Sequence, residues 1–314
     1  MNKPTNWSAA NIPSQQGRRA LITGANSGIG FEAALELARH GAEIILPART
    51  LAKAEDAITR IRREVPAAII TAAVLDLASL ASVHVFAEFV TARFPGQSLD
   101  LLINNAGVMA IPHRELTVDG YERQFATNYL GPFALTALLF ASIKPQPGAR
   151  IVIVSSSASK FGKIDFDNLQ SEHVYKPMFG CYSQSKLADS VFALELQRRL
   201  TAAGSPIICT AAHPGYAVTN LQTSGPGEGM SLTRFMTTIL KPIASQDAAH
   251  GALPTLLAAT APEAVAGGYY GPSGFQELKG DPVPVKIAPA AKDPAVAKRL
   301  WTVTEQLTGV AFNI

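Results

Sequence analysis

The chain has 314 residues, of which 47% are hydrophobic and 16% charged, and it can bury a large core within one α/β domain. The net charge of +3 is small and the basic residues are scattered, which argues against a nucleic-acid partner. The two cysteines make no disulfide framework and fit a reducing cytosol, so we expect a cytoplasmic protein. Residues 1–17 lack an apolar signal region and no run reaches about 18 apolar residues, so we expect no membrane anchor.

Strand-like and helix-like segments alternate along the first two thirds of the chain. The pattern predicts strands at 18–23, 42–48, 67–75, 99–104, 150–155 and 207–212, and helices at 28–40, 51–64, 79–93, 118–143 and 180–203. Apolar strands joined through helices indicate a parallel sheet covered on both faces. We therefore expect an α/β fold of the Rossmann type, with a doubly wound parallel sheet.

Beyond Pro214 the pattern becomes looser. Residues 216–245 include a stretch rich in Gly, Ser and Pro, and we expect them to form a loop or lid over the substrate. We expect residues 281–314 to form a C-terminal extension. We see no linker that would separate a second domain, so we expect residues 1–314 to form a single domain. The remaining predicted elements are helices at 231–240, 246–259 and 293–308, an extended stretch at 281–289, and a strand at 268–270 that brings the sheet to about seven strands.

The first predicted strand runs into a glycine-rich turn, T-G-A-N-S-G-I-G, at residues 23–30. Gly24, Gly28 and Gly30 can adopt backbone angles closed to other residues and allow close approach of a ligand. The following helix directs unpaired N–H groups and its positive dipole end at the same place. Asn26 and Ser27 add side-chain donors. The turn therefore predicts a phosphate site, although a tight turn without a ligand would give the same pattern.

The second predicted strand ends at Ala48, and Arg49 follows it. In dinucleotide-binding folds this position meets the ribose of the adenosine, where an acidic residue accepts a hydrogen bond from the 2′-OH of NAD. A guanidinium can instead bind a 2′-phosphate through two parallel hydrogen bonds. We therefore favour NADP over NAD. The alternative is a solvated arginine at the start of a helix.

Polar and small residues follow the third and fourth predicted strands. Asp76-Leu77 follows the third strand and Asn104–Gly107 ends the fourth. Open α/β sheets bind ligands at these carboxyl ends of their strands. Further along, Tyr182 and Lys186 are spaced i and i+4 and share one face of a predicted helix. A free phenol loses its proton near pH 10, and a nearby ammonium favours the phenolate. The pair is therefore a candidate for acid–base chemistry.

Taken together, five ordered motifs resemble the short-chain dehydrogenase/reductase superfamily over about residues 18–272. They are the glycine turn, Asp76-Leu77, Asn104–Gly107, the set of serines 155–157 with Tyr182 and Lys186, and His213-Pro214-Gly215. Finer features resemble the retinol-dehydrogenase-like branch: Asn105-Ala106-Gly107-Val108-Met109, Phe166-Asp167-Asn168-Leu169 and Ser185-Lys186-Leu187-Ala188.

The resemblance implies roles for individual residues. Tyr182 would exchange a proton with the carbonyl or alcohol oxygen, and Lys186 would favour the phenolate and hold the nicotinamide ribose. Ser156, with Ser157 as the alternative, would bind the carbonyl oxygen, and Asn128 would anchor a water in a proton relay. Contacts to NADP, or to NAD as the alternative, are implied for Gly24, Asn26, Ser27, Gly28, Ile29, Gly30, Arg49, Asp76, Leu77, Asn105, Ala106, Gly107, Tyr182, Lys186, Pro214, Gly215, Ala217 and Thr219.

These residues predict an NADP-dependent oxidoreductase that reduces apolar ketones and aldehydes and works reversibly as an alcohol dehydrogenase. Met109, Tyr216 and Phe235 are candidates for substrate contact. Three alternatives stay open: a non-catalytic NADP-binding sensor or scaffold, a retinol-type alcohol dehydrogenase on the same residues, and a specialised reductase of a large substrate such as a tetrapyrrole. A homo-oligomer is compatible with the sequence. The histidines show no metal-ligand spacing, so we expect no metal site.

Overall fold

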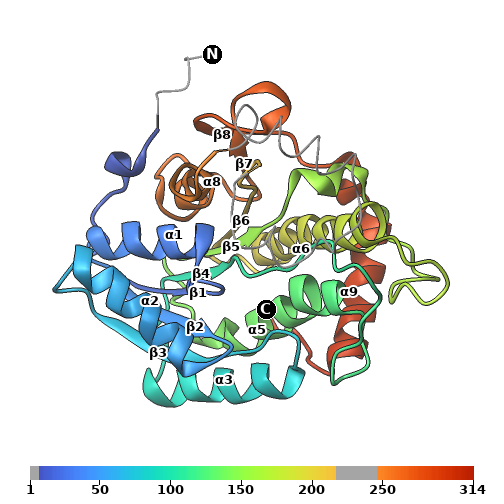
Figure 1. Ribbon diagram of the computed structural model, residues 1–314, viewed down its shortest axis with the longest axis horizontal. Helices are drawn as coiled ribbons and strands as arrows, with labels where there is room; N and C mark the ends of the chain where they lie inside the picture. Colours follow the sequence, from blue (N-terminus) through green and yellow to red (C-terminus); the bar gives the residue numbers. More distant parts are fainter. Residues whose placement is uncertain (1–6, 217–245) are drawn as a thin grey trace.

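The computed structural model describes residues 7–216 and 246–314, and the eight strands in this part of the chain form one sheet (Figure 1). The strand order is β3-β2-β1-β4-β5-β6-β7-β8, and every pair is parallel except β7 with β8. The strands are β1 Arg19–Ile22, β2 Glu43–Ala48, β3 Ile70–Val74, β4 Leu101–Asn104, β5 Arg150–Val154, β6 Ile208–Ala212, β7 Tyr269–Pro272 and β8 Pro282–Pro284. The predicted doubly wound Rossmann-type fold is confirmed.

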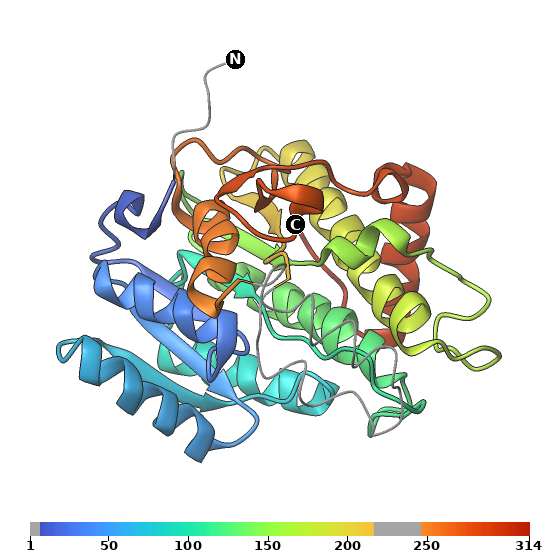
Figure 2. The ribbon, with the colours of Figure 1, turned by 45° about the horizontal axis from the view of Figure 1, so that its top comes forward.

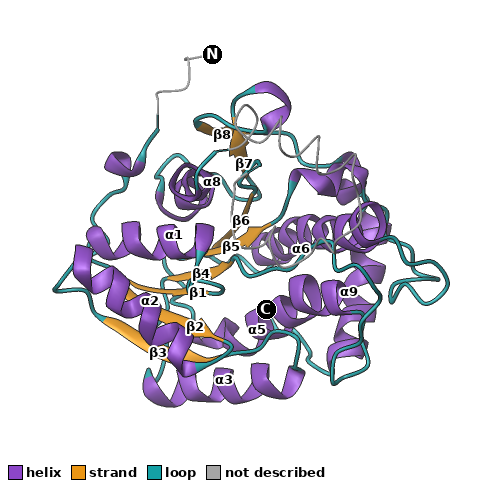
Figure 3. Cartoon of the chain, in the orientation of Figure 1, coloured by secondary structure: helices purple, strands orange, loops and turns teal. Residues whose placement is uncertain are grey.

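Helices cover both faces of the sheet (Figure 3). The α-helices are α1 Gly28–Arg39, α2 Leu51–Glu64, α3 Leu80–Arg93, α4 Arg123–Phe125, α5 Gly131–Leu139, α6 Ser183–Ala202, α8 Ala248–Thr260 and α9 Pro294–Thr308. The core on one face joins α1, α2 and α8 to the sheet, and the core on the other joins α3, α5 and α6, with α9 packed against α5 and α6 (Figure 2).

The strands are apolar on both sides because both faces of the sheet are buried. In β1, Leu21 packs into one core while Ala20 and Ile22 pack into the other, as the alternation of side chains along a strand requires. The helices show the complementary pattern. In α2 one face is buried, and the hydroxyl of Thr50 caps the first turn by accepting a hydrogen bond from the Lys53 N–H.

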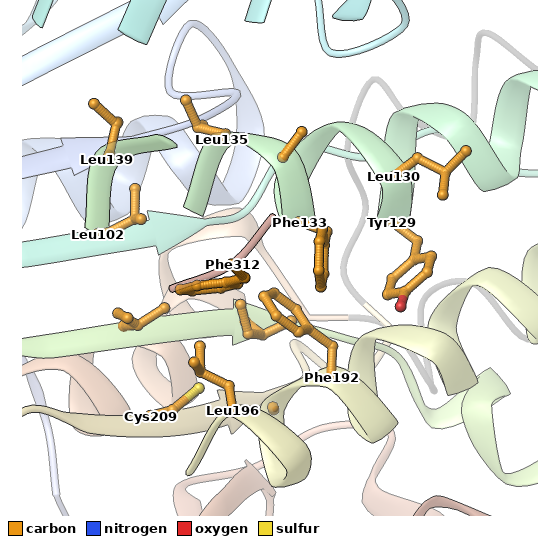
Figure 4. Packing of buried hydrophobic residues seen from close by; sticks show 14 of the residues in the cluster. Leu102, Tyr129, Leu130, Phe133, Leu135, Leu139, Phe192, Leu196, Cys209 and Phe312 are labelled. Carbon is orange, nitrogen blue, oxygen red and sulfur yellow. The ribbon is translucent and has the colours of Figure 1, made fainter. Parts of the chain in front are cut away.

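Aromatic side chains fill the core between α5 and α6 (Figure 4). Phe312, from the last residues of the chain, packs edge-on against Phe133 of α5 with ring centres 5.7 Å apart. It also stacks on Trp301 of α9 at 5.1 Å. Phe192 of α6 lies within the same cluster, 5.2 Å from Phe133. The predicted C-terminal extension is therefore part of the core against which the central helices pack.

Two helix predictions were wrong at their starts. The helix predicted at 118–143 begins at Arg123, because Gly120 adopts a positive φ of 82° and Glu122 caps the helix by accepting hydrogen bonds from two N–H groups of its first turn. It then passes through a wider π-turn, Ala126–Leu130, before α5. The helix predicted at 180–203 likewise begins as a π-turn, Pro177–Tyr182, and becomes α-helical at Ser183.

The predicted number of strands, about seven, was also too low. The proline-rich stretch predicted as extended contributes β8, which pairs antiparallel to β7 at the edge of the sheet. An edge position suits Pro282 and Pro284, because proline has no N–H to donate to a second neighbour. The helix predicted at 231–240, and all of the predicted lid except Tyr216, lie outside the described residues.

In the described part of the chain, one helical stretch is long and apolar enough to cross a membrane. It is Arg123–Ser142, which contains α4 and α5, and 72% of its apolar window is buried inside the fold. Burial against the sheet and the neighbouring helices explains this apolar character without a membrane.

Candidate active site

The polar residues singled out in the sequence follow the carboxyl ends of parallel strands, so they lie along one edge of the sheet. Asp76 follows β3, Arg49 follows β2, the glycine turn follows β1, Asn105 follows β4, Ser156 follows β5 and Pro214 follows β6. The strand order reverses between β1 and β4, and ligands of open α/β sheets bind at this switch point. The glycine turn therefore stands at the centre of a row of candidate ligand contacts.

The glycine turn is tight enough to require glycine. Gly24 and Gly28 have φ values of 70° and 58°, which L side chains rarely adopt. A Cβ added to Gly24 would lie 2.9 Å from the Cα of Ala106, and one added to Gly30 would lie 2.6 Å from the carbonyl oxygen of Gly24. These glycines let α1 begin directly against the loop after β4.

The first turn of α1 fits the phosphates of a dinucleotide. Ser27 precedes the helix but its hydroxyl does not cap it. The first N–H groups of an α-helix have no partner within the helix, so those of Gly28, Ile29 and Gly30 can bind an anion. Asn26 and Ser27 are half-buried beside them. The backbone donors of this turn, and not the glycines alone, therefore suit it to bind a phosphate.

Thr23, which was not predicted as a site residue, fixes the turn to the loop after β4. Its hydroxyl oxygen accepts hydrogen bonds from the N–H groups of Asn105 and Ala106, both at 3.0 Å. The amide of Asn105 donates in return to the carbonyl oxygen of Thr23 at 2.9 Å. Asn105 and Ala106 are thus held beside the turn, as a shared contact surface for one ligand requires.

At the β2–β3 end of this row lie a carboxylate held by hydrogen bonds, Asp76, and an exposed guanidinium, Arg49. The Asp76 carboxylate accepts a hydrogen bond from the N–H of Ala78, and the backbone N–H of Asp76 donates to the hydroxyl oxygen of Ser82. Leu77 is buried. Arg49 is exposed directly after β2, and within the described residues its guanidinium makes no hydrogen bond or ion pair. No group of the described residues therefore competes with a phosphate for that guanidinium.

Tyr182 and Lys186 lie at the other end, at the start of α6. Tyr182 is the last residue of the π-turn, and its side chain is buried. The Nζ atom of Lys186 donates to the carbonyl oxygen of Val154 at 2.9 Å and to the carboxylate of Asp189 at 2.8 Å. Burial alone lowers the pKa of Lys186, but the Asp189 carboxylate, with a smaller contribution from the negative charge of Tyr182 when it is ionised, outweighs burial and the pKa is raised.

Asp189 was missed in the sequence, although its i,i+3 spacing from Lys186 was visible. Its carboxylate and the lysine ammonium are 2% and 6% exposed, so the ion pair is almost wholly buried. Burial raises the pKa of Asp189 to about 7, and Lys186 opposes this rise only in part.

The three serines after β5 differ in their surroundings. The hydroxyl of Ser155 is buried and donates to the carbonyl oxygen of Lys186 at 2.7 Å, which ties β5 to α6. Ser156 is half-buried, and its hydroxyl oxygen accepts a hydrogen bond from the Ala158 N–H at the start of the short helix Ser157–Phe161. Ser156 therefore remains the candidate to bind a carbonyl oxygen, with Ser157 next to it.

Asn128 lies in the π-turn that precedes α5, and π-turns are frequent at functional sites. Its amide donates to the carbonyl oxygen of Val108 and to the hydroxyl of Ser185, and its amide oxygen accepts from the N–H of Val108. A Cβ on Gly107 would lie 3.5 Å from Nζ of Lys186. Asn128 thus ties the loop after β4 to α6 beside Lys186, while its part in a water relay stays a prediction.

His213 fixes the loop after β6. Its ring is fully buried, with Nδ1 accepting from the N–H of Gly215 and Nε2 facing the carboxylate of Glu277 at 2.9 Å. This pattern places the ring proton on Nε2. Gly215 has a φ of 65° and packs tightly against Leu278, and the carbonyl oxygen of Pro214 accepts from Gln246.

The remaining predicted contacts divide between described and undescribed residues. Met109 and Tyr216 are half-buried next to the loops after β4 and β6. Ala217, Thr219 and Phe235 lie outside the described residues. Among the residues described, no group of three His, Cys, Asp or Glu side chains could hold a metal ion.

Comparison with known proteins agrees with this arrangement. The family model for short chain dehydrogenases matches residues 18–226. Human retinol dehydrogenase 14 is 38% identical, over 94% of this chain and 87% of that protein. The crystal structure of an uncharacterized protein from Mycobacterium paratuberculosis is 40% identical with a TM-score of 0.80, over 99% of this chain and 100% of that one.

A more distant structure was solved with a bound cofactor. A blue fluorescent protein from a metagenomic library, in complex with NADPH, is 25% identical with a TM-score of 0.61, over 82% of this chain and 96% of that one. The sheet, the glycine turn and these similarities lead to one conclusion: the chain belongs to the short-chain dehydrogenase/reductase superfamily, in its retinol-dehydrogenase-like branch, and is an NAD(P)-dependent oxidoreductase.

Proposed function

We propose that this protein uses NADPH to reduce apolar ketones and aldehydes to alcohols, and that it catalyses the reverse reaction with NADP. The observation that carries the proposal is the meeting of Tyr182, Lys186 and the loop of Ser156 at the edge of the sheet that also holds the glycine turn. This edge offers a phosphate site and an acid–base pair in one row.

Arg49 supports NADP in preference to NAD. It follows β2, where an acidic residue would bind the 2′-OH of NAD, and its exposed guanidinium makes no bond with the described part of the chain. A guanidinium offers two parallel N–H donors to a phosphate. The similar blue fluorescent protein was solved with NADPH.

Each residue of the site then has a task in the reaction. When bound, the nicotinamide supplies the hydride to the carbonyl carbon or accepts it from the alcohol. The Tyr182 hydroxyl gives its proton to the carbonyl oxygen during reduction, and the Lys186 ammonium stabilises the phenolate that remains. The Ser156 hydroxyl orients the carbonyl oxygen. Asn128 holds the loop at Val108 against α6, so that the cofactor and the acid meet in a fixed geometry.

The substrate is proposed to be apolar. Met109 and Tyr216 are half-buried beside the predicted hydride-transfer end of the site, and Phe235 is a candidate from the sequence. The related human protein is named a retinol dehydrogenase, and retinol is a long apolar alcohol. A retinol-type alcohol dehydrogenase on the same residues is therefore the second candidate.

The experiment is an NADPH-consumption assay with Tyr182→Phe against aliphatic, aromatic and polyene carbonyl compounds. We expect turnover to fall by about 10²-fold to 10⁴-fold, because the proton donor is lost, while NADPH affinity is largely kept. Tyr121→Phe is the matched control, because that hydroxyl bonds to the carbonyl oxygen of Leu307 and lies outside the site. Full turnover in Tyr182→Phe would contradict the mechanism. A wild-type protein that binds NADPH but reduces no carbonyl compound would favour a non-catalytic sensor.

A further inference from the structure

A buried carboxylate lies directly against the ammonium on which the proposed chemistry depends. Asp189 and Lys186 sit on one face of α6, their charged atoms are 2.8 Å apart, and both side chains are almost completely buried. The second partner of the ammonium is the carbonyl oxygen of Val154 at the end of β5. Lys186 is therefore held between a strand end and a buried carboxylate.

The ion pair changes the electrostatic environment of the Tyr182 hydroxyl. An isolated ammonium favours the phenolate, whereas an ammonium paired with a carboxylate presents a dipole with little net charge. The low exposure of the pair limits screening by water. If the ion pair only joined two turns of α6, the partner of Asp189 would not need to be Lys186, the lysine of the proposed site.

Among the residues that the structure describes, the other groups near Asp189 carry no charge at neutral pH. Tyr129 faces it from the π-turn before α5, and burial raises the pKa of Tyr129. The Tyr129 hydroxyl bonds to the hydroxyl of Thr304 from α9. From β5 the contribution is the neutral carbonyl of Val154, and Tyr269 of β7, on the side of Tyr182, also has its pKa raised by burial. Within the described part of the chain, the balance of charge at Tyr182 thus depends on Lys186 and Asp189.

We propose that Asp189 is a positioning residue for proton transfer. Its carboxylate holds the Lys186 ammonium against β5, offsets its charge, and thereby sets the pH range in which Tyr182 gives and takes its proton. The inference rests on the proposed role of Tyr182, and it predicts that removing the negative charge moves the ionisation of Tyr182 to lower pH.

The test compares the wild type with Asp189→Asn, which keeps the size and an acceptor oxygen but removes the charge. The readout is the near-ultraviolet absorbance of tyrosinate, titrated in each protein and in the same protein carrying Tyr182→Phe, so that the difference isolates Tyr182. We expect the midpoint to fall by roughly one pH unit in Asp189→Asn. Glu195→Gln, the same type of change on α6 at an acid paired with Arg198 and Arg199, should leave the midpoint unchanged.

An unchanged midpoint in folded Asp189→Asn would overturn the inference. If that variant does not fold, Lys186→Met is compared with the double variant Lys186→Met/Asp189→Leu. The added Asp189→Leu change must then lower the ionisation midpoint of Tyr182. The titration needs no substrate, so it is independent of the proposed function. With a working alcohol substrate, the acid limb of kcat/KM for oxidation should shift in the same direction. A shifted midpoint without any turnover would support the inference and contradict the proposed function.

Discussion

The contact between α1 and the loop after β4 gives a prediction whose magnitude follows from the structure. In Gly30→Ala the new Cβ would lie 2.6 Å from the carbonyl oxygen of Gly24 and closer still to the amide nitrogen of Asn105. Normal contact distances require α1 to retreat by about half an ångström or more. The overpacking should cost about 1–3 kcal/mol, while the better helix propensity of alanine returns at most about 1 kcal/mol.

The same retreat should weaken cofactor binding. The hydrogen bond from Asn105 to Thr23 would be strained, and the first N–H groups of α1 would move away from the phosphates. We expect the Kd for NADPH, measured by fluorescence titration, to rise at least about tenfold, which is about 1.4 kcal/mol. Urea unfolding should show a net loss of stability of about 1–2 kcal/mol.

Gly17→Ala is the matched control for this substitution. Gly17 also has a positive φ, 77°, but it is exposed and an added Cβ would meet no atom within 4 Å. This variant should lose about 1 kcal/mol through backbone strain and bind NADPH as the wild type does. Wild-type NADPH affinity in Gly30→Ala would refute the reasoning that the close approach shapes the phosphate site.

Two further predictions concern residues outside the row of cofactor contacts. Tyr129→Phe should lower the free energy of unfolding by about 1 kcal/mol through loss of its hydroxyl contact with α9, with kcat unchanged; a fall in kcat at unchanged stability would contradict this structural role. Glu277 is paired with His213 and Lys160, and these partners lower its pKa from 4.5 to about 2. Because the folded-state pKa is the lower one, its stabilisation is present above pH 4.5 and is lost as the pH falls towards about 2. Partial exposure reduces the effect to about 1 kcal/mol, so Glu277→Gln should be destabilised in urea at about pH 7 and match the wild type near pH 2, whereas Glu88→Gln should not differ at either pH.

The strands, and the common edge at which the candidate site residues lie, could be predicted because their signals are local. A strand buried on both faces must be apolar throughout, and a ligand at the carboxyl edge requires small or polar residues directly after it. The glycine turn, Asp76 and Asn105 all follow such strands, so their common edge followed from a parallel sheet. The spacing of Tyr182 and Lys186 was equally visible within a single helix.

Other features depend on contacts that are distant in sequence. The two π-turns at Asn128 and Tyr182 are set by packing around the site, and helix periodicity does not distinguish them from ordinary turns. Thr23 looked like the end of a strand until the structure placed it against Asn105. In the sequence Asp189 is an ordinary polar residue of a predicted helix. Its burial beside Lys186 could not be predicted, because that burial depends on β5 and the π-turn before α5.

The aromatic cluster between α5 and α6 has a consequence for the order in which the protein is built. Phe133 and Phe192 are synthesised long before Trp301 and Phe312, which cover them. A nascent chain therefore carries Tyr182 and Lys186 on a helix whose apolar underside is still open to water. Such exposed surface is prone to aggregation and is a natural target for chaperones during translation. Helix α6 can reach its final stability only after the C-terminal aromatic residues have docked.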